Sequence, residues 1–231
     1  MDIHGLQKMT LLDFPGRVAC TVFLKGCDLR CPFCHNYELA CGEGDAVMSD
    51  TAFFDFLAGR RGLLDGVAIT GGEPCLYSGL PDFVRQIRGL GFAVKLDTNG
   101  LHPDMLSSLL REGLVDYAAM DIKNSPEKYA ATCGREALDL APVRESISLL
   151  MGSGIDYEFR TTVVREFHEA DDFPQIGEMI RGARRYYLQA FTDRDTVPFE
   201  GFHAWPAEEM QKFLEIVRPY VAEAALRGVS L

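Results

Sequence analysis

The sequence predicts an α/β fold built on a parallel sheet, in the form of an incomplete (β/α)6 barrel. Two observations lead to this prediction. Six short runs rich in β-branched and apolar residues recur along the chain, and a helical pattern follows most of them. Such alternation favours parallel strands joined by helical crossovers. An open doubly wound sheet is the competing arrangement. In both, reactive loops follow the carboxyl ends of the strands.

The predicted strands are continuous apolar runs, which are typical of strands buried on both faces. They are Val18–Leu24, Val67–Thr70, Ala93–Asp97, Tyr117–Ile122, Tyr157–Val164 and Tyr186–Phe191.

The predicted helices begin at capping residues or prolines and most of them end near glycines. Ser49 is placed to cap the first helix, and Gly91 to end the second. The helices are Asp50–Arg60, Pro81–Leu90, Pro103–Arg111, Pro126–Thr132, Pro142–Met151, Asp172–Arg184 and Ala207–Leu226. We expect Pro219 to kink the last one.

Length and composition are those of an ordinary soluble domain. The chain has 231 residues, of which 47% are hydrophobic, so we expect residues 1–231 to form a single domain with a sizeable core. Such a core folds without metal or disulfide links, so a bound metal is expected to serve chemistry. The formal net charge of −11 argues against nucleic acid as a partner.

The start of the sequence, its apolar runs and its cysteines all bear on the cellular compartment. No basic and apolar leader begins the sequence, and no run of about 18 apolar residues occurs, so we expect a cytoplasmic protein without a membrane partner. Three of the seven cysteines lie within eight residues, which in a cytoplasmic chain indicates metal binding or catalysis. We expect the scattered Cys20, Cys41, Cys75 and Cys133 to be small buried residues rather than ligands.

The clustered cysteines follow the first predicted strand directly. Cys27, Cys31 and Cys34 have the spacing C-x3-C-x2-C. A loop of this size lets three thiolates converge on one iron–sulfur cluster, and three ligands leave one iron open to a substrate. The alternative is a structural zinc site completed by His35 or Cys41. It is disfavoured because the sequence has no second cysteine knuckle.

Polar residues also follow the next three predicted strands. Gly71-Gly72-Glu73-Pro74 ends the second, where glycines would permit close approach of a ligand and Glu73 supplies negative charge. Asp97-Thr98-Asn99-Gly100 ends the third, and Asp121-Ile122-Lys123 ends the fourth. The two aspartates and Lys123 would converge at one edge of a parallel sheet. Helix capping and surface ion pairs are the simpler reading of these residues taken alone.

Together, Cys27-x3-Cys31-x-Phe33-Cys34 and the Gly-Gly-Glu-Pro element resemble the radical SAM superfamily and its incomplete barrel. The resemblance implies that the three cysteines bind a 4Fe–4S cluster, whose open iron binds S-adenosylmethionine (SAM). Reductive cleavage of SAM then yields a 5′-deoxyadenosyl radical that abstracts a hydrogen atom. It also implies an adenine contact at Phe33.

Beyond these motifs, the chain is similar to the activating enzymes of glycyl-radical enzymes. The similar stretches include residues 5–16, 26–36, 157–164 and 186–191, and they favour the longer form of the activases of anaerobic ribonucleoside-triphosphate reductase. The implied contacts to SAM come from His35, Asn36, Gly71, Gly72, Glu73, Asp97, Thr98, Asp121, Lys123, Arg160 and Gln189. A monovalent cation is implied at Asp97 and Asp121, although Lys123 could supply the same charge. Arg160 could instead contact the partner peptide or form an outer ion pair.

The implied partners are a glycyl-radical enzyme and a flavodoxin- or ferredoxin-type electron donor. The sequence departs from the pyruvate formate-lyase activase at Phe191, where that enzyme has a histidine, and Gln189 is the nearest polar substitute. We expect His168, in a polar loop, to face solvent. The alternative function is a radical SAM enzyme acting on a small molecule or on another peptide. The chain is expected to end soon after the sixth strand with one helix, and the wide mouth that this leaves favours the activase.

Overall fold

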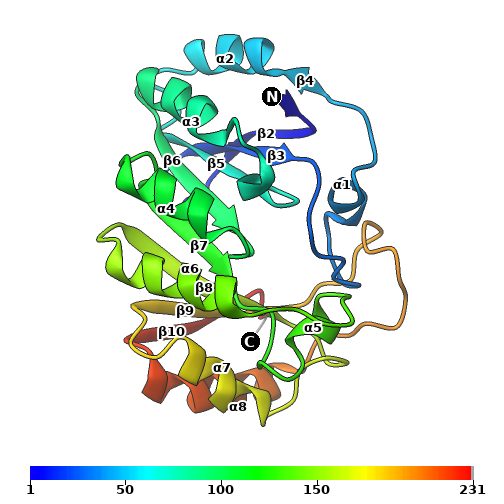
Figure 1. Ribbon diagram of the computed structural model, residues 1–231. Helices are drawn as coiled ribbons and strands as arrows, with labels where there is room; N and C mark the ends of the chain where they lie inside the picture. Colours follow the sequence, from blue (N-terminus) through cyan, green and yellow to red (C-terminus); the bar gives the residue numbers. More distant parts are fainter. Residues whose placement is uncertain (230–231) are drawn as a thin grey trace.

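The computed structural model describes residues 1–229, and its centre is an open eight-stranded sheet (Figure 1). The strand order is β10-β9-β8-β7-β6-β5-β3-β2, and every neighbouring pair is parallel except β2 and β3. The strands are β2 Gly5–Thr10, β3 Ala19–Leu24, β5 Gly66–Gly71, β6 Ala93–Thr98, β7 Tyr117–Asp121, β8 Asp156–Val163, β9 Arg185–Ala190 and β10 Glu223–Arg227. Because β2 and β10 are the two edges, the barrel does not close.

The six predicted strands are confirmed as β3 and β5 to β9. Each lies within two residues of its predicted bounds, because an apolar run buried on both faces leaves little choice of position. A separate antiparallel pair joins β1, Asp2–Ile3, to β4, Met48–Ser49.

The longer helices lie along the outer side of the sheet in Figure 1. They are α2 Asp50–Ala58, α3 Leu80–Gly89, α4 Pro103–Arg111, α6 Ala141–Gly152, α7 Asp172–Met179 and α8 Ala207–Val217. The predicted cap of α2 is confirmed, since the amide of Ala52 donates to Ser49 Oγ over 3.3 Å. Fully buried side chains such as Val84 and Ile87 of α3 belong to the main core.

Shorter helices lie on the opposite side of the open sheet. Figure 1 shows α1, Tyr37–Cys41, and α5, Tyr129–Thr132, on that side, next to the segment that links β9 to α8. The 3-10 turns η1, Pro74–Leu76, and η2, Arg218–Tyr220, complete the elements.

The prediction of a helix over Ala207–Leu226 is wrong in its second half. Helix α8 ends at Val217, and Pro219 lies in η2 rather than at a kink. Residues Glu223–Arg227 then form β10, which pairs with β9. Alanine and leucine favour helix locally, but a sheet edge at β9 was available for pairing, and tertiary context overrides propensity. Within residues 1–229, the sixth predicted strand is therefore followed by a helix and a further strand rather than by one helix alone.

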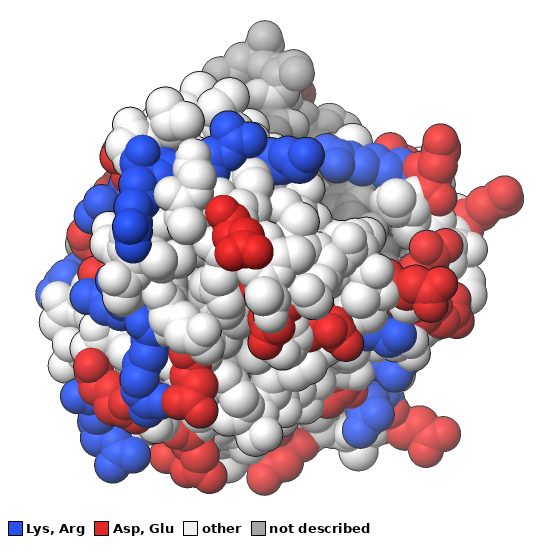
Figure 2. Space-filling view, turned by 90° about the horizontal axis from the view of Figure 1, so that it is seen from above, with Lys and Arg blue, Asp and Glu red and all other residues white. Residues whose placement is uncertain are grey.

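The surface carries charges of both signs. In the view of Figure 2, a row of Lys and Arg side chains runs along the upper edge, and side chains of both signs are intermixed along the left and lower edges. Among residues 1–229, no helix combines the length and apolarity needed to cross a membrane.

Candidate functional site

A cavity of about 460 Å³ opens at the carboxyl ends of the parallel strands. It is lined by side chains or backbone from β3, β5, β6, β7, β8 and β9 and from the cysteine loop after β3. The predicted site residues that line it are Cys27, Cys31, Phe33, Cys34, His35, Asn36, Gly71, Gly72, Asp97, Thr98, Asp121, Lys123, Arg160 and Gln189. The structure thus brings together all of the predicted site residues except Glu73.

The three thiols of the cysteine loop face this cavity. Cys31 is buried, and Cys27 and Cys34 are half-buried. Burial raises the pKa of Cys27 to about 12 and also raises the pKa of Cys34. A hydrogen bond with the buried Cys133 lowers the pKa of Cys31 to about 7. Three thiols on one cavity wall are a donor set that suits an iron–sulfur cluster with an open iron.

The zinc alternative finds little support in the loop. His35 Nε2 lies 2.6 Å from the carbonyl oxygen of Thr192, so this ring nitrogen already has a hydrogen-bond partner. Cys41 does not line the cavity.

The glycine pair packs against the cysteine loop. The amide of Gly72 donates to the carbonyl of Leu24 over 2.8 Å, and the amide of Glu73 donates to that of Gly26 over 2.8 Å. A Cβ atom on Gly71 would lie 2.2 Å from the Leu24 oxygen, and one on Gly72 would lie 2.0 Å from the Gly26 oxygen. Glycine is therefore required here by close approach of two backbones, a cause that the sequence pattern did not reveal.

Glu73 is the predicted site residue that does not line the cavity. Its carboxylate is fully buried and accepts three hydrogen bonds, from the Cys75 amide (2.9 Å), the Thr98 hydroxyl (2.9 Å) and the Asn99 amide (2.6 Å). Burial raises its pKa despite these donors. The carboxylate links the turn after β5 to the end of β6, and a direct contact with the SAM ammonium group remains a prediction.

A cluster of five alternating charges adjoins the cavity, and four of its members line it. Arg160 donates from Nε to Asp121 (2.6 Å) and from Nη2 to Asp97 (3.1 Å). Lys123 Nζ lies 2.8 Å from Asp121, and Lys95 pairs with Asp97. Burial alone would raise the pKa of each aspartate, but Arg160 and the lysines outweigh it and hold both pKa values below the ordinary range.

The prediction that His168 faces solvent is wrong. The imidazole is fully buried, and Nε2 lies 2.8 Å from the carbonyl oxygen of Lys123. Burial lowers the pKa of His168. Its loop turns inward because the Asn124 side chain donates to the carbonyl of Phe167 over 2.8 Å. His168 thereby supports the backbone that carries Lys123.

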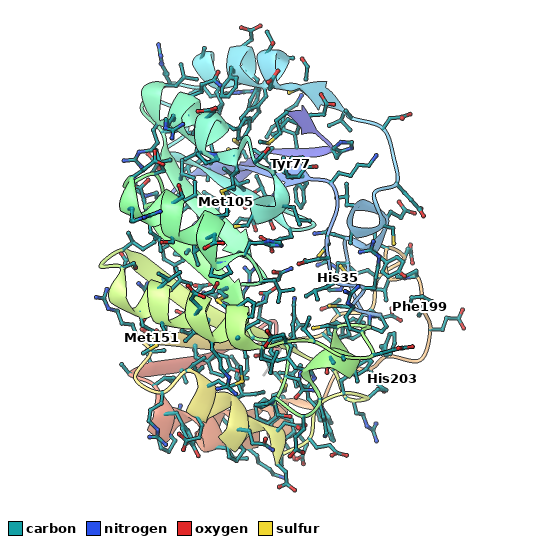
Figure 3. All side chains as sticks on the ribbon, viewed as in Figure 1. His35, Tyr77, Met105, Met151, Phe199 and His203 are labelled. Carbon is teal, nitrogen blue, oxygen red and sulfur yellow. The ribbon has the colours of Figure 1, made fainter. Side chains whose placement is uncertain are left out.

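An aromatic cluster surrounds the cysteine loop. Phe33 lines the cavity and also packs on Phe167, with ring centres 5.5 Å apart. His35 stacks on Phe191 with ring centres 5.7 Å apart. Figure 3 shows His35 on the side of the molecule that also carries Phe199, in the segment after β9. Phe191 is buried outside the cavity lining, and Gln189 lines the cavity.

Sequence reasoning did not select several polar residues of the site, including the four that follow. Asp13, Asn99 and Arg194 line the cavity, and Lys95 is buried beneath Asp97. Lys95 precedes Asp97 by two positions on the same strand face, so alternation could have found it. Asp13 and Arg194 lie outside the regular strands and gave no such signal.

Comparisons with known proteins bear on the family of the chain. Residues 21–179 match the family model described as the radical SAM superfamily. The chain is 27% identical to a protein of Methanocaldococcus jannaschii named for glycyl-radical enzyme activation, over 99% of this chain and 96% of that one. It is 30% identical to the pyruvate formate-lyase-activating enzyme of Clostridium pasteurianum, but the match spans only 52% of that protein and 53% of this chain.

A solved structure supports the fold. Streptococcus suis SuiB bound to its precursor peptide SuiA superposes with a TM-score of 0.70 at 14% identity, covering 90% of this chain and 48% of that one.

Proposed function

The chain belongs to the radical SAM superfamily, and from this premise we propose that it is an activase that generates a glycyl radical on a partner enzyme. The observation that carries the proposal is the full-length similarity to a protein named for glycyl-radical enzyme activation, in a chain whose three thiols and charged cluster share one cavity. When bound, the 4Fe–4S cluster and SAM would supply the radical that abstracts hydrogen from the glycine.

Different residues of the cavity would take different roles in this reaction. Cys27, Cys31 and Cys34 would hold the cluster. Lys123 and Arg160 present positive charge to the same cavity and suit the carboxylate of SAM. Phe33 and Gln189 line the cavity and would contact the adenosine.

The partner follows from the same proposal. We propose an anaerobic ribonucleoside-triphosphate reductase, because residues 5–16 and 26–36 resemble the activases of that reductase. We also propose a flavodoxin- or ferredoxin-type electron donor and a cytoplasmic, anaerobic setting, with residues 1–231 acting as one domain. The resemblance also implies a monovalent cation at Asp97 and Asp121. The contacts of Arg160 with both carboxylates argue against this cation.

The test is anaerobic reconstitution with iron, sulfide, SAM and a reductant, followed by addition of candidate glycyl-radical enzymes. Electron paramagnetic resonance should detect a glycyl doublet on the correct partner. Release of 5′-deoxyadenosine with no doublet on any candidate would favour the alternative, a radical SAM enzyme acting on a small molecule or another peptide. Replacing the target glycine of the partner with alanine is the matched control and should abolish the doublet.

A further inference from the structure

The two aspartates of the charged cluster already have protein cations on every oxygen. Asp121 accepts from Arg160 on one oxygen and Lys123 on the other. Asp97 accepts from Arg160 on one oxygen and Lys95 on the other. A monovalent metal ion between these carboxylates would have to displace Arg160 or bind beside its positive charge.

Charge balance gives the same result. Three cationic side chains, Lys95, Lys123 and Arg160, face two carboxylates, which leaves one positive charge in excess. The carboxylate group of SAM, which is separate from the ammonium and sulfonium groups of that molecule, carries one negative charge and would balance this local excess if it lay against Lys123 and Arg160. A metal ion would restore an uncompensated positive charge in a mostly buried site, which is unfavourable.

Strand register explains how Arg160 reaches both aspartates. Arg160 is the direct partner of Asp121 between β7 and β8, while Asp97 is the direct partner of Ala119 between β6 and β7. Ala119 precedes Asp121 by two positions and therefore shares its strand face. The small side chain of Ala119 leaves room for the arginine to cross β7 to Asp97.

Arginine is suited to this position. Its planar guanidinium is always charged and offers several donors in fixed directions, so one group can bridge two carboxylates. We propose that the Arg160 guanidinium takes the place of a monovalent metal ion between Asp97 and Asp121, and that SAM binding by this chain is independent of such ions. This inference rests on the proposed function in one respect, namely that SAM is the ligand.

The first test measures the SAM dissociation constant of the cluster-loaded protein by anaerobic equilibrium dialysis. Tetramethylammonium, sodium and potassium chloride are compared at equal ionic strength. For the wild-type protein the constants should agree within about twofold. For Arg160→Ala, binding should weaken about tenfold or more in tetramethylammonium and recover partly in potassium, because an ion can enter the vacated space. Tighter wild-type binding in potassium than in tetramethylammonium would contradict the inference.

Arg194→Ala is the matched control. Arg194 also lines the cavity, but it has no ion pair with Asp97 or Asp121 in the described residues. Its loss should weaken SAM binding without creating a dependence on potassium. Such a dependence in this variant too would show that the effect is not specific to Arg160 and would count against the inference.

A second test needs neither SAM nor the cluster and so separates this inference from the proposed function. Thallium(I), a substitute for potassium, is titrated into the apoprotein and followed by thallium-205 nuclear magnetic resonance. The wild-type chain should show no saturable site that depends on Asp97, and Arg160→Ala should acquire one that Asp97→Asn then removes. Saturable binding by the wild-type chain that Asp97→Asn abolishes would overturn the inference, even if no glycyl radical is ever formed.

Discussion

The backbone amide of Asn99 donates to Glu73 Oε2 over 2.6 Å, which joins the end of β6 to the turn after β5 inside the molecule. The Asn99 side chain also donates to Asp28 over 2.8 Å and lies 3.8 Å from Cys27 Sγ. One short segment therefore links the buried carboxylate to the cysteine loop. Changes at Glu73 should disturb the loop although Glu73 does not line the cavity.

Replacing Glu73 with glutamine should destabilise the apoprotein. The carboxylate accepts three hydrogen bonds on its two oxygens. An amide has only one acceptor oxygen, and the hydrogens of its NH2 group would point at groups that also donate. We expect a loss of about 2–3 kcal/mol in the free energy of unfolding, measured by urea denaturation. Glu112→Gln, at a solvent-exposed ion pair, is the control and should cost much less stability. Equal losses in the two variants would show that the buried carboxylate has no special role.

Gly72→Ala should displace the cysteine loop. The added methyl group would lie 2.0 Å from the carbonyl oxygen of Gly26, so one backbone must move. We expect a loss of about 1–3 kcal/mol in stability, together with reduced iron incorporation. In Gly89→Ala, at the end of α3, the new methyl group meets no atom within 4 Å, and the change should be neutral or slightly stabilising. Normal iron content in Gly72→Ala would refute the role assigned to this contact.

The burial of His168 predicts that the stability of the folded chain depends on pH. Burial lowers its pKa in the folded chain, so the unfolded chain binds a proton first as the pH falls. The contribution of the neutral, buried imidazole to the free energy of unfolding is therefore complete above the pKa of histidine in the unfolded chain, about 6.5. This contribution is lost as the pH falls below that value. The unfolding free energy of the wild-type apoprotein should fall between pH 7.5 and 5.5 more steeply than that of His168→Gln. Parallel curves for the two proteins would rule out this contribution.

Much of the site was predictable because it follows from strand order. Apolar runs located β3 and β5 to β9, and polar residues after each run had to meet at one edge of a parallel sheet. That rule correctly brought together residues as distant in sequence as Cys27 and Lys123.

Features that depend on long-range pairing were not predictable. β2 is an edge strand whose exposed Gln7, Lys8 and Met9 resemble a loop. β10 has a helical composition and is held by pairing with β9 and by the ion pair of Arg227 with the buried Glu158. The burial of His168 likewise depends on a contact with Lys123, 45 residues away.

Single replacement of Cys27, Cys31 or Cys34 by alanine should abolish cluster assembly and SAM cleavage. Cys41→Ala is the matched control, because Cys41 ends α1 in the same region but does not line the cavity. Iron analysis and 5′-deoxyadenosine release measure the two outcomes. Retained SAM cleavage in any of the three variants would refute the ligand assignment.

Mössbauer spectroscopy of the anaerobically reconstituted wild-type chain tests the central claim most directly. The account predicts a 4Fe–4S spectrum in which SAM alters the signal of one iron, because three thiolates leave that iron open. A protein that took up only zinc, or a cluster with four equivalent irons that did not respond to SAM, would contradict it.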